Sequence, residues 1–135
     1  MYHQLKHLKK KKGLTFRMIK GIGMDLVELD RIEKLYKRNG RFKERILTYK
    51  EKEYFSRLIN ERRQIEFLAG RFAAKEALAK AAGTGIGKLS FHDIEVLPSN
   101  NGAPQVEMKG FEQNTLHLSI THSQTYAAAQ AVIEE

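Results

Sequence analysis

Cysteine is absent from the sequence, so the protein can form no disulfide bond and no thiolate metal site. No apolar run approaches the length that a membrane span requires. The basic residues at the start are not followed by an apolar segment, which argues against a secretion signal. We therefore expect a cytoplasmic protein with no membrane partner. Apolar residues make up 41% of the 135 residues, which is enough for the core of one domain.

The excess of basic residues is concentrated at the amino-terminal end. Residues 1–17 contain six Lys or Arg and no Asp or Glu, whereas residues 18–135 contribute only +2 to the net charge of +8. Such a segment could bind nucleic acid electrostatically. The explanation that we favour is an upstream translated stretch or a non-native addition, with Met18 as the natural start. We therefore expect a basic extension over residues 1–17, disordered or non-native, and one domain over residues 18–135.

The charge of the remaining chain is also uneven. Residues 31–80 carry a net charge of +8, and residues 81–135 carry −4. A basic middle could attract an acidic partner. On charge alone, solvated helix faces are the more ordinary explanation.

The segment "MIKGIGMDLVEL" (residues 18–29) predicts a buried strand. Because side chains alternate along a strand, Gly21 and Gly23 should share a face with Ile19 and Asp25. A face without bulk beside a carboxylate allows two interpretations. It can pack closely against a helix, or it can leave room for a ligand.

Four helices are expected to follow, at residues 30–40, 41–48, 48–58 and 61–82. Asp30 and Asn60 are plausible N-caps of the first and the last of them. Thr48 and Glu51 have the spacing of a capping box. Gly83 is a natural stop for the long helix.

The second half of the sequence alternates as strands do. The segments "HDIEVLP" and "PQVEM" predict two strands around the turn "SNNG", and "LHLSITHS" predicts a third. The ending "YAAAQAVIEE" is either a helix, which its alanines favour, or a strand that pairs with "LHLSITH". We predict a single-domain α+β fold with a helical first half packed on a largely antiparallel sheet.

The glycine run "AGTGIGKL" (residues 82–89) resembles a phosphate-binding P-loop only superficially. Ala82 occupies the first glycine position, and Leu89 stands where Ser or Thr should bind magnesium. A P-loop also opens a helix, whereas this run follows one. The run is either a flexible backbone wall beside a ligand or a simple loop, and the pattern alone favours the loop.

Glu76 and Lys80 lie one turn apart on the predicted long helix, a spacing at which surface ion pairs are common and weak. However, the neighbours of Glu76 are alanines, which allow close approach. A carboxylate with a cation one turn away suits a magnesium ion with a phosphate ligand, and Asp25 is a second candidate ligand. His122 is flanked by hydroxyl residues that could bind phosphate or cap turns, although a lone histidine at a strand end is more often structural.

The sequence contains the segments "GIGMDLVELDRI", "FLAGRFAAKEALAKAAGTGIG", "LSFHDIEV" and "LSITHSQTYAAAQAVIE". Together they resemble bacterial holo-acyl-carrier-protein synthases, the small trimeric class of 4′-phosphopantetheinyl transferases. The resemblance runs from Met18 to about Glu134. It implies transfer of phosphopantetheine from coenzyme A to a serine of apo acyl carrier protein in fatty-acid biosynthesis, with release of adenosine 3′,5′-bisphosphate. It also implies a magnesium cofactor and a homotrimer with active sites between subunits.

By this resemblance, Asp25 and Glu76 hold the magnesium ion, and Lys80 completes the catalytic set. The serine is deprotonated either by Glu76 through a bound water or by a water that receives little help from the protein. Lys80 stabilises or protonates the departing α-phosphate. Six residues match positions expected to bind coenzyme A: Arg71, Lys80, Gly83, Thr84, Gly85 and His122.

Acyl carrier proteins are small and acidic, so the resemblance also gives the basic middle of the chain a partner. Five residues are candidates for docking the carrier: Arg31, Lys34, Arg38, Arg41 and Arg45. Arg31 is the strongest of them, because it lies nearest to Asp25 along the chain.

Two other classes of function compete with the transferase. One is a nucleic-acid-binding domain, which deletion of residues 1–17 would test. The other is an inactive trimeric interaction module, against which the joint presence of Asp25, Glu76 and Lys80 argues. We expect no nucleic acid partner.

Overall fold

The structure of the protein is a computed structural model that describes residue 4, residue 7 and residues 17–135. The basic extension predicted for residues 1–17 therefore lies almost entirely outside the described residues. In the described part of the chain, no helix is long and apolar enough to cross a membrane.

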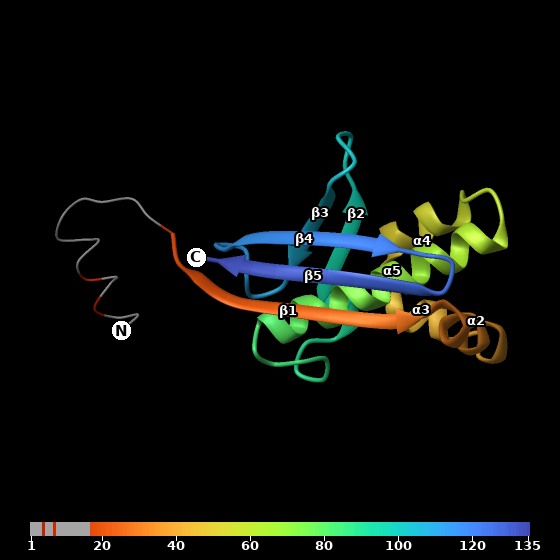
Figure 1. Cartoon of the computed structure of the whole chain (residues 1–135), viewed down its shortest axis with the longest axis horizontal. Coiled ribbons are helices and arrows are strands. Elements are labelled where there is room, and N and C mark those ends of the chain that lie inside the picture. Colours follow the sequence, from red (N-terminus) through yellow and green to blue (C-terminus); the bar gives the residue numbers. More distant parts are fainter. Residues whose placement is uncertain (1–3, 5–6, 8–16) are drawn as a thin grey trace.

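A three-stranded antiparallel sheet forms one layer of the fold, with the strand order β1-β5-β4. Its strands are β1 (Ile19–Glu28), β4 (Thr115–His122) and β5 (Tyr126–Glu134). The long helix α5 (Glu61–Ala81) packs against one face of this sheet. Figure 1 shows three further helices gathered at the end of the sheet where β1 ends: α2 (Leu29–Arg38), α3 (Phe42–Ile46) and α4 (Tyr49–Ser56).

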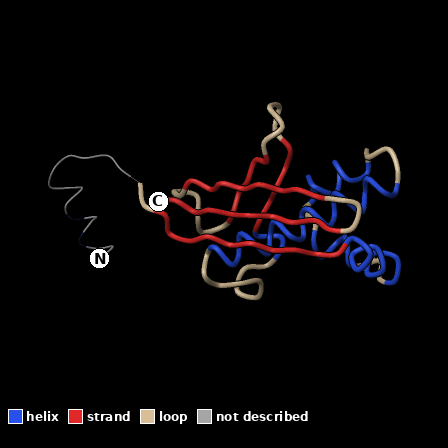
Figure 2. Tube along the Cα trace, in the orientation of Figure 1, coloured by secondary structure: helices blue, strands red, loops and turns tan. Residues whose placement is uncertain are grey.

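A separate two-stranded hairpin projects from the body of the molecule (Figure 2). It consists of β2 (Ile94–Pro98) and β3 (Pro104–Met108), and a short 3-10 helix, η1 (Phe91–Asp93), leads into it. The observed architecture confirms the predicted single-domain α+β fold.

The ambiguous ending of the chain is a strand, and it is the central one. Strand β5 pairs with β4, as the strand interpretation predicted, and also with β1. Across the sheet, Asp25 pairs with Ala129, and Ala129 pairs with Ile120. The alanines favour a helix by propensity, but here alternate alanines are needed on the face that meets α5.

The glycines of β1 allow close packing against α5. A Cβ atom on Gly21 would lie 1.9 Å from the carbonyl oxygen of Ala81, and one on Gly23 would lie 2.0 Å from that of Ala77. The interpretation of close packing is therefore confirmed. Helix α5 occupies the space beside these two glycines, so that space is not available to a ligand. The prediction that Ile19 shares their face is wrong, because a bulge between Ile19 and Gly21 interrupts the alternation and leaves Ile19 exposed.

Most predicted helix ends are confirmed. Thr48 and Glu51 form the capping box of α4, and the side chain of Asn60 caps α5. Gly83 follows the end of α5 with a φ of 81°. Asp30 is not an N-cap, because α2 begins one residue earlier, at Leu29, whose backbone N–H donates to the carbonyl oxygen of Thr125 at 2.9 Å.

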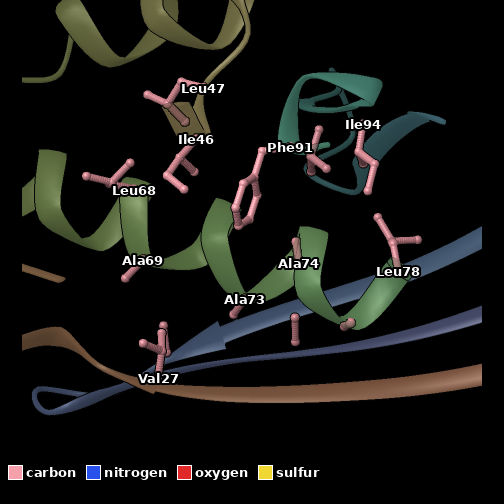
Figure 3. Close-up of a cluster of buried hydrophobic side chains, with 14 of the residues drawn as sticks. Val27, Ile46, Leu47, Leu68, Ala69, Ala73, Ala74, Leu78, Phe91 and Ile94 are labelled. Atoms are coloured by element: carbon pink, nitrogen blue, oxygen red, sulfur yellow. The ribbon is translucent and has the colours of Figure 1, made fainter. Parts of the chain in front are cut away.

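Helix α5 is buried on both sides, which is unusual for a helix with this many charges. Figure 3 shows Val27 between the helix and the sheet, and Ile46, Leu47 and Phe91 on the opposite side of the helix. The central turns of α5 therefore have no face that opens fully to solvent, and their charged side chains need specific partners.

Candidate active site

Asp25 and Lys80 meet where β1 crosses the carboxyl-terminal part of α5. The Lys80 ammonium donates to Asp25 Oδ1 and to the carbonyl oxygen of Met24, both at 3.0 Å. The other carboxylate oxygen, Asp25 Oδ2, is buried and has no hydrogen-bond partner among the described residues. Because a buried carboxylate oxygen without a partner is unfavourable, this atom is well placed to bind a cation.

Glu76 lies close enough to Asp25 for the Asp25 charge to act on the Glu76 carboxyl. Burial raises the pKa of Glu76, and the negative charge of Asp25 raises it further. The charges of Lys80 and Arg31 act in the opposite direction. The structure thus brings together the three residues predicted to be catalytic, and it places Arg31 within electrostatic range of them.

The donor set fits a magnesium ion. Among the described residues, no group of three or more His, Asp or Glu side chains could hold a metal. The site offers two carboxylates instead, one of which has a free oxygen. Magnesium typically binds through one or two carboxylates, several waters and substrate phosphate oxygens, so two protein ligands are sufficient.

The glycine loop continues directly from this end of α5. The backbone N–H of Gly83 donates to the carbonyl oxygen of Lys80 at 3.0 Å. Gly83 and Gly85 have φ angles of 81° and 66°, and a Cβ atom added to either would meet no atom within 4 Å beyond its chain neighbours. Open space and left-handed backbone together suit a loop that a ligand approaches closely. Thr84, between them, also belongs to this loop.

Arg71 does not join Asp25 and Glu76 within one chain. It precedes Glu76 by five residues, which corresponds to about 140° around the helix axis. Its Nε donates to the carbonyl oxygen of Val96 at 3.0 Å, and its guanidinium lies 4.1 Å from the ring centroid of Phe67. Burial lowers the pKa of Arg71 to about 10, so it remains positively charged at neutral pH.

His122 also lies apart from the two carboxylates. Its Nδ1 is 3.6 Å from Glu66 Oε2, and the same carboxylate group pairs with Arg62 and Arg63. The contacts of Arg71 and His122 within the chain are thus with Val96, Phe67 and Glu66 rather than with Asp25 or Glu76.

The docking candidates lie on one end of the molecule. All five are exposed: Arg31, Lys34, Arg38, Arg41 and Arg45. Arg31 is in the first turn of α2, directly after the strand that carries Asp25.

A buried ion pair was not predicted. Lys75, for which the sequence predicted no role, is completely buried and contacts Glu51 of α4. The one signal for its burial was its position within the alanine run.

Comparison with known proteins assigns the class. Residues 21–131 match the family model of the 4′-phosphopantetheinyl transferase superfamily, so the chain belongs to this family. Within it, the chain is 56% identical over 117 residues to the holo-[acyl-carrier-protein] synthase of Oceanobacillus iheyensis, an alignment that covers 87% of this chain and 98% of the relative. It is 57% identical over 118 residues to that of Geobacillus kaustophilus, covering 87% and 90%.

Solved structures agree with this assignment. The holo-(acyl-carrier-protein) synthase of Bacillus anthracis in complex with CoA (3′,5′-ADP) superimposes with a TM-score of 0.80 at 50% identity, covering 87% of this chain and 98% of the other. The Helicobacter pylori enzyme in complex with coenzyme A superimposes with a TM-score of 0.71 at 34% identity, covering 83% and 98%.

Proposed function

We propose that this protein is a magnesium-dependent holo-[acyl-carrier-protein] synthase. It transfers 4′-phosphopantetheine from coenzyme A to a serine of apo acyl carrier protein and releases adenosine 3′,5′-bisphosphate. The observation that carries the proposal is the meeting of Asp25, Glu76 and Lys80 at the contact of β1 with α5. Family membership and the similarity to holo-[acyl-carrier-protein] synthases support it.

The reaction replaces a phosphoanhydride bond of coenzyme A with a phosphoester bond to the serine. The serine hydroxyl oxygen forms a bond to the β-phosphorus of the pyrophosphate, and the bond from that phosphorus to the bridging oxygen breaks. The bridging oxygen keeps the electron pair and leaves with adenosine 3′,5′-bisphosphate. Such transfers depend mainly on positioning and charge stabilisation.

Each residue of the site has a role in this exchange. Asp25 and Glu76 would hold the magnesium ion, which supplies positive charge to the pyrophosphate oxygens when bound. Glu76 accepts the serine proton through a water, and its raised pKa suits a proton acceptor. Lys80 stabilises or protonates the departing α-phosphate. The loop with Gly83, Thr84 and Gly85 lines the coenzyme A site, to which Lys80 also belongs.

We also propose a homotrimer with active sites between subunits. Three apolar side chains on the face of β1 away from α5 are about two-thirds exposed: Ile22 (67%), Met24 (65%) and Leu26 (64%). A second copy that covers them would remove an apolar surface from water. Assembly also explains how Arg71 and His122 can reach coenzyme A bound at another copy's Asp25. A mass of 15.5 kDa by light scattering, that of one chain, would contradict the trimer.

The pathway and compartment follow from the same proposal. We place the enzyme in fatty-acid biosynthesis in the cytoplasm, with apo acyl carrier protein and coenzyme A as its substrates. Residues 18–135 form the enzyme domain, which includes every described helix and strand named above.

The decisive test is a mass measurement on the carrier. Purified protein, magnesium, coenzyme A and apo acyl carrier protein are incubated together, and intact mass spectrometry follows the carrier. We expect a gain of roughly 340 Da, the mass of one phosphopantetheine group, and we expect EDTA to abolish it. No gain with any of several fatty-acid carriers would contradict the proposal.

The substitution Arg31→Glu tests the docking surface. We expect the KM for acyl carrier protein to rise about tenfold or more, because a charge reversal repels an acidic partner. The KM for coenzyme A should change less. Steady-state kinetics with each substrate varied in turn separates the two effects.

The matched control is Lys109→Glu, which makes the same change of charge at the end of β3, away from α2. It should leave both KM values near those of the parent. Equal increases in the two KM values of Arg31→Glu would count against a docking role.

A further inference from the structure

One buried charge pair takes no part in the proposed reaction. The side chains of Lys75 and Glu51 are both fully buried, and Lys75 Nζ lies 2.6 Å from Glu51 Oε1. Lys75 directly precedes Glu76 in α5, so the lysine of this pair is adjacent in sequence to a residue of the proposed site.

Every hydrogen of the Lys75 ammonium has an acceptor. Besides Glu51, it donates to the carbonyl oxygens of Ile46 at 2.7 Å and Phe91 at 3.1 Å. These acceptors come from three different segments: the end of α3, the first turn of α4 and η1. The ammonium therefore ties one point on α5 to three elements that lie on its far side from the sheet.

Glu51 is equally well satisfied. Its Oε1 also accepts from the backbone N–H of Thr48 at 2.8 Å, and its Oε2 accepts from that of Val96 at 2.7 Å. Arg71 of α5 donates to the carbonyl oxygen of the same residue, Val96. Val96 of the hairpin strand β2 is thus bonded to Glu51 of α4 through its N–H and to Arg71 of α5 through its carbonyl oxygen.

On the opposite face of α5, Lys80 in the last turn donates to Asp25 Oδ1 and to the carbonyl oxygen of Met24. Elsewhere on this face the helix meets the sheet through small residues, with Ala77 against Gly23 and Ala81 against Gly21. Such a contact allows close approach, but burial of apolar surface is not directional and does not by itself select one rotation of the helix. Hydrogen bonds are directional, and a fully satisfied buried network can specify a single arrangement.

We propose that Lys75 is a positioning residue, whose bonds to Glu51, Ile46 and Phe91 set the rotation of α5 so that Glu76 meets Asp25. This inference rests on the proposed function of Asp25 and Glu76. Stability alone does not account for the pair, because well-packed apolar replacements of buried ion pairs are often neutral or stabilising. Removal of the network is expected to let α5 settle at a slightly different rotation, which displaces Glu76 from its productive geometry.

The absence of any other cysteine allows a test that changes only the charge. The variant Lys75→Cys is alkylated in denaturant and refolded. Bromoethylamine creates a side chain close to lysine in length and charge, whereas iodopropane creates one of similar length without charge. Circular dichroism checks that both products are folded.

The two products should differ in catalysis and in metal binding. We expect the aminoethylated protein to retain kcat within about threefold of the parent, because its ammonium restores the bonds. The propylated protein should lose kcat on the order of 10²-fold, with the KM for acyl carrier protein unchanged. Its affinity for Mn²⁺, followed by electron paramagnetic resonance without substrate, should also fall about tenfold or more.

The results separate this inference from the proposed function. A folded propylated protein with the kcat and Mn²⁺ affinity of an active parent would overturn the positioning role alone. If the parent neither modifies the carrier nor binds Mn²⁺, the proposed function fails, and this inference fails with it. Should the propylated protein not refold, the double variant Glu51→Gln/Lys75→Met removes both charges and keeps an acceptor for Val96. A folded double variant must then show the same two losses, and parental values would overturn the inference.

Discussion

Replacing Glu76 with Gln is expected to lower turnover by about 10³-fold or more while the fold stays intact. The amide has nearly the shape of the carboxylate but removes one of the two charges that face Lys80 and the proposed metal ion. It also removes the proton acceptor for the serine. The rate of carrier modification by intact mass spectrometry measures the loss, and circular dichroism verifies the fold. Near-normal turnover would remove Glu76 from the active site.

The same substitution should stabilise the protein when no divalent cation is present. Because burial and Asp25 raise the pKa of Glu76, the charged form is less favourable in the folded than in the unfolded state. The resulting penalty is absent below the ordinary pKa of 4.5 and grows as the pH rises through the raised value. In EDTA, Glu76→Gln should therefore have a higher Tm than the parent at pH 7 and a similar Tm near pH 4.

The control for this effect is Glu53→Gln, which makes the same chemical change at an exposed position of α4. Its Tm and turnover should match those of the parent at both pH values. A lower Tm for Glu76→Gln in EDTA at pH 7 would contradict the electrostatic account, since it would mean that the Glu76 carboxylate stabilises the metal-free fold.

Gly23→Ala is expected to have the largest effect on stability, with a loss of about 3 kcal/mol in the free energy of unfolding. The added Cβ would lie 2.0 Å from the carbonyl oxygen of Ala77 and 2.8 Å from the backbone nitrogen of Ala81. Both neighbours are backbone atoms of α5, so relief requires the helix and the strand to separate. Asp25 lies two residues further along this strand, and turnover should fall as well. Urea denaturation measures the change.

Gly40→Ala is the matched control. No atom lies within 4 Å of a Cβ at this position, and its backbone is not left-handed. We expect a change within about 0.5 kcal/mol. If Gly23→Ala changed the free energy of unfolding as little as Gly40→Ala, the fold would not depend on the close contact of β1 with α5.

Part of the site was accessible from the sequence. The spacing of Glu76 and Lys80 on a helix of small residues, and the carboxylate Asp25 behind two glycines, singled out all three residues. Their meeting was not accessible, because Asp25 and Glu76 are far apart in sequence and only the packing of β1 on α5 brings them together. The glycines also had two valid interpretations, and only the position of Ala77 and Ala81 decided between them.

The sequence by itself determined the secondary structure up to the last strand, the helix caps at Thr48 and Asn60, and the chemical character of the site, because these depend on periodicity, local hydrogen bonds and residue type. Only the tertiary structure decided what depends on distant partners. It made residues 126–134 the central strand, separated Arg71 and His122 from Asp25, and buried Lys75 against Glu51. A local pattern cannot report such partners, since a lysine in a helix looks the same in sequence whether it faces water or three acceptors in the core.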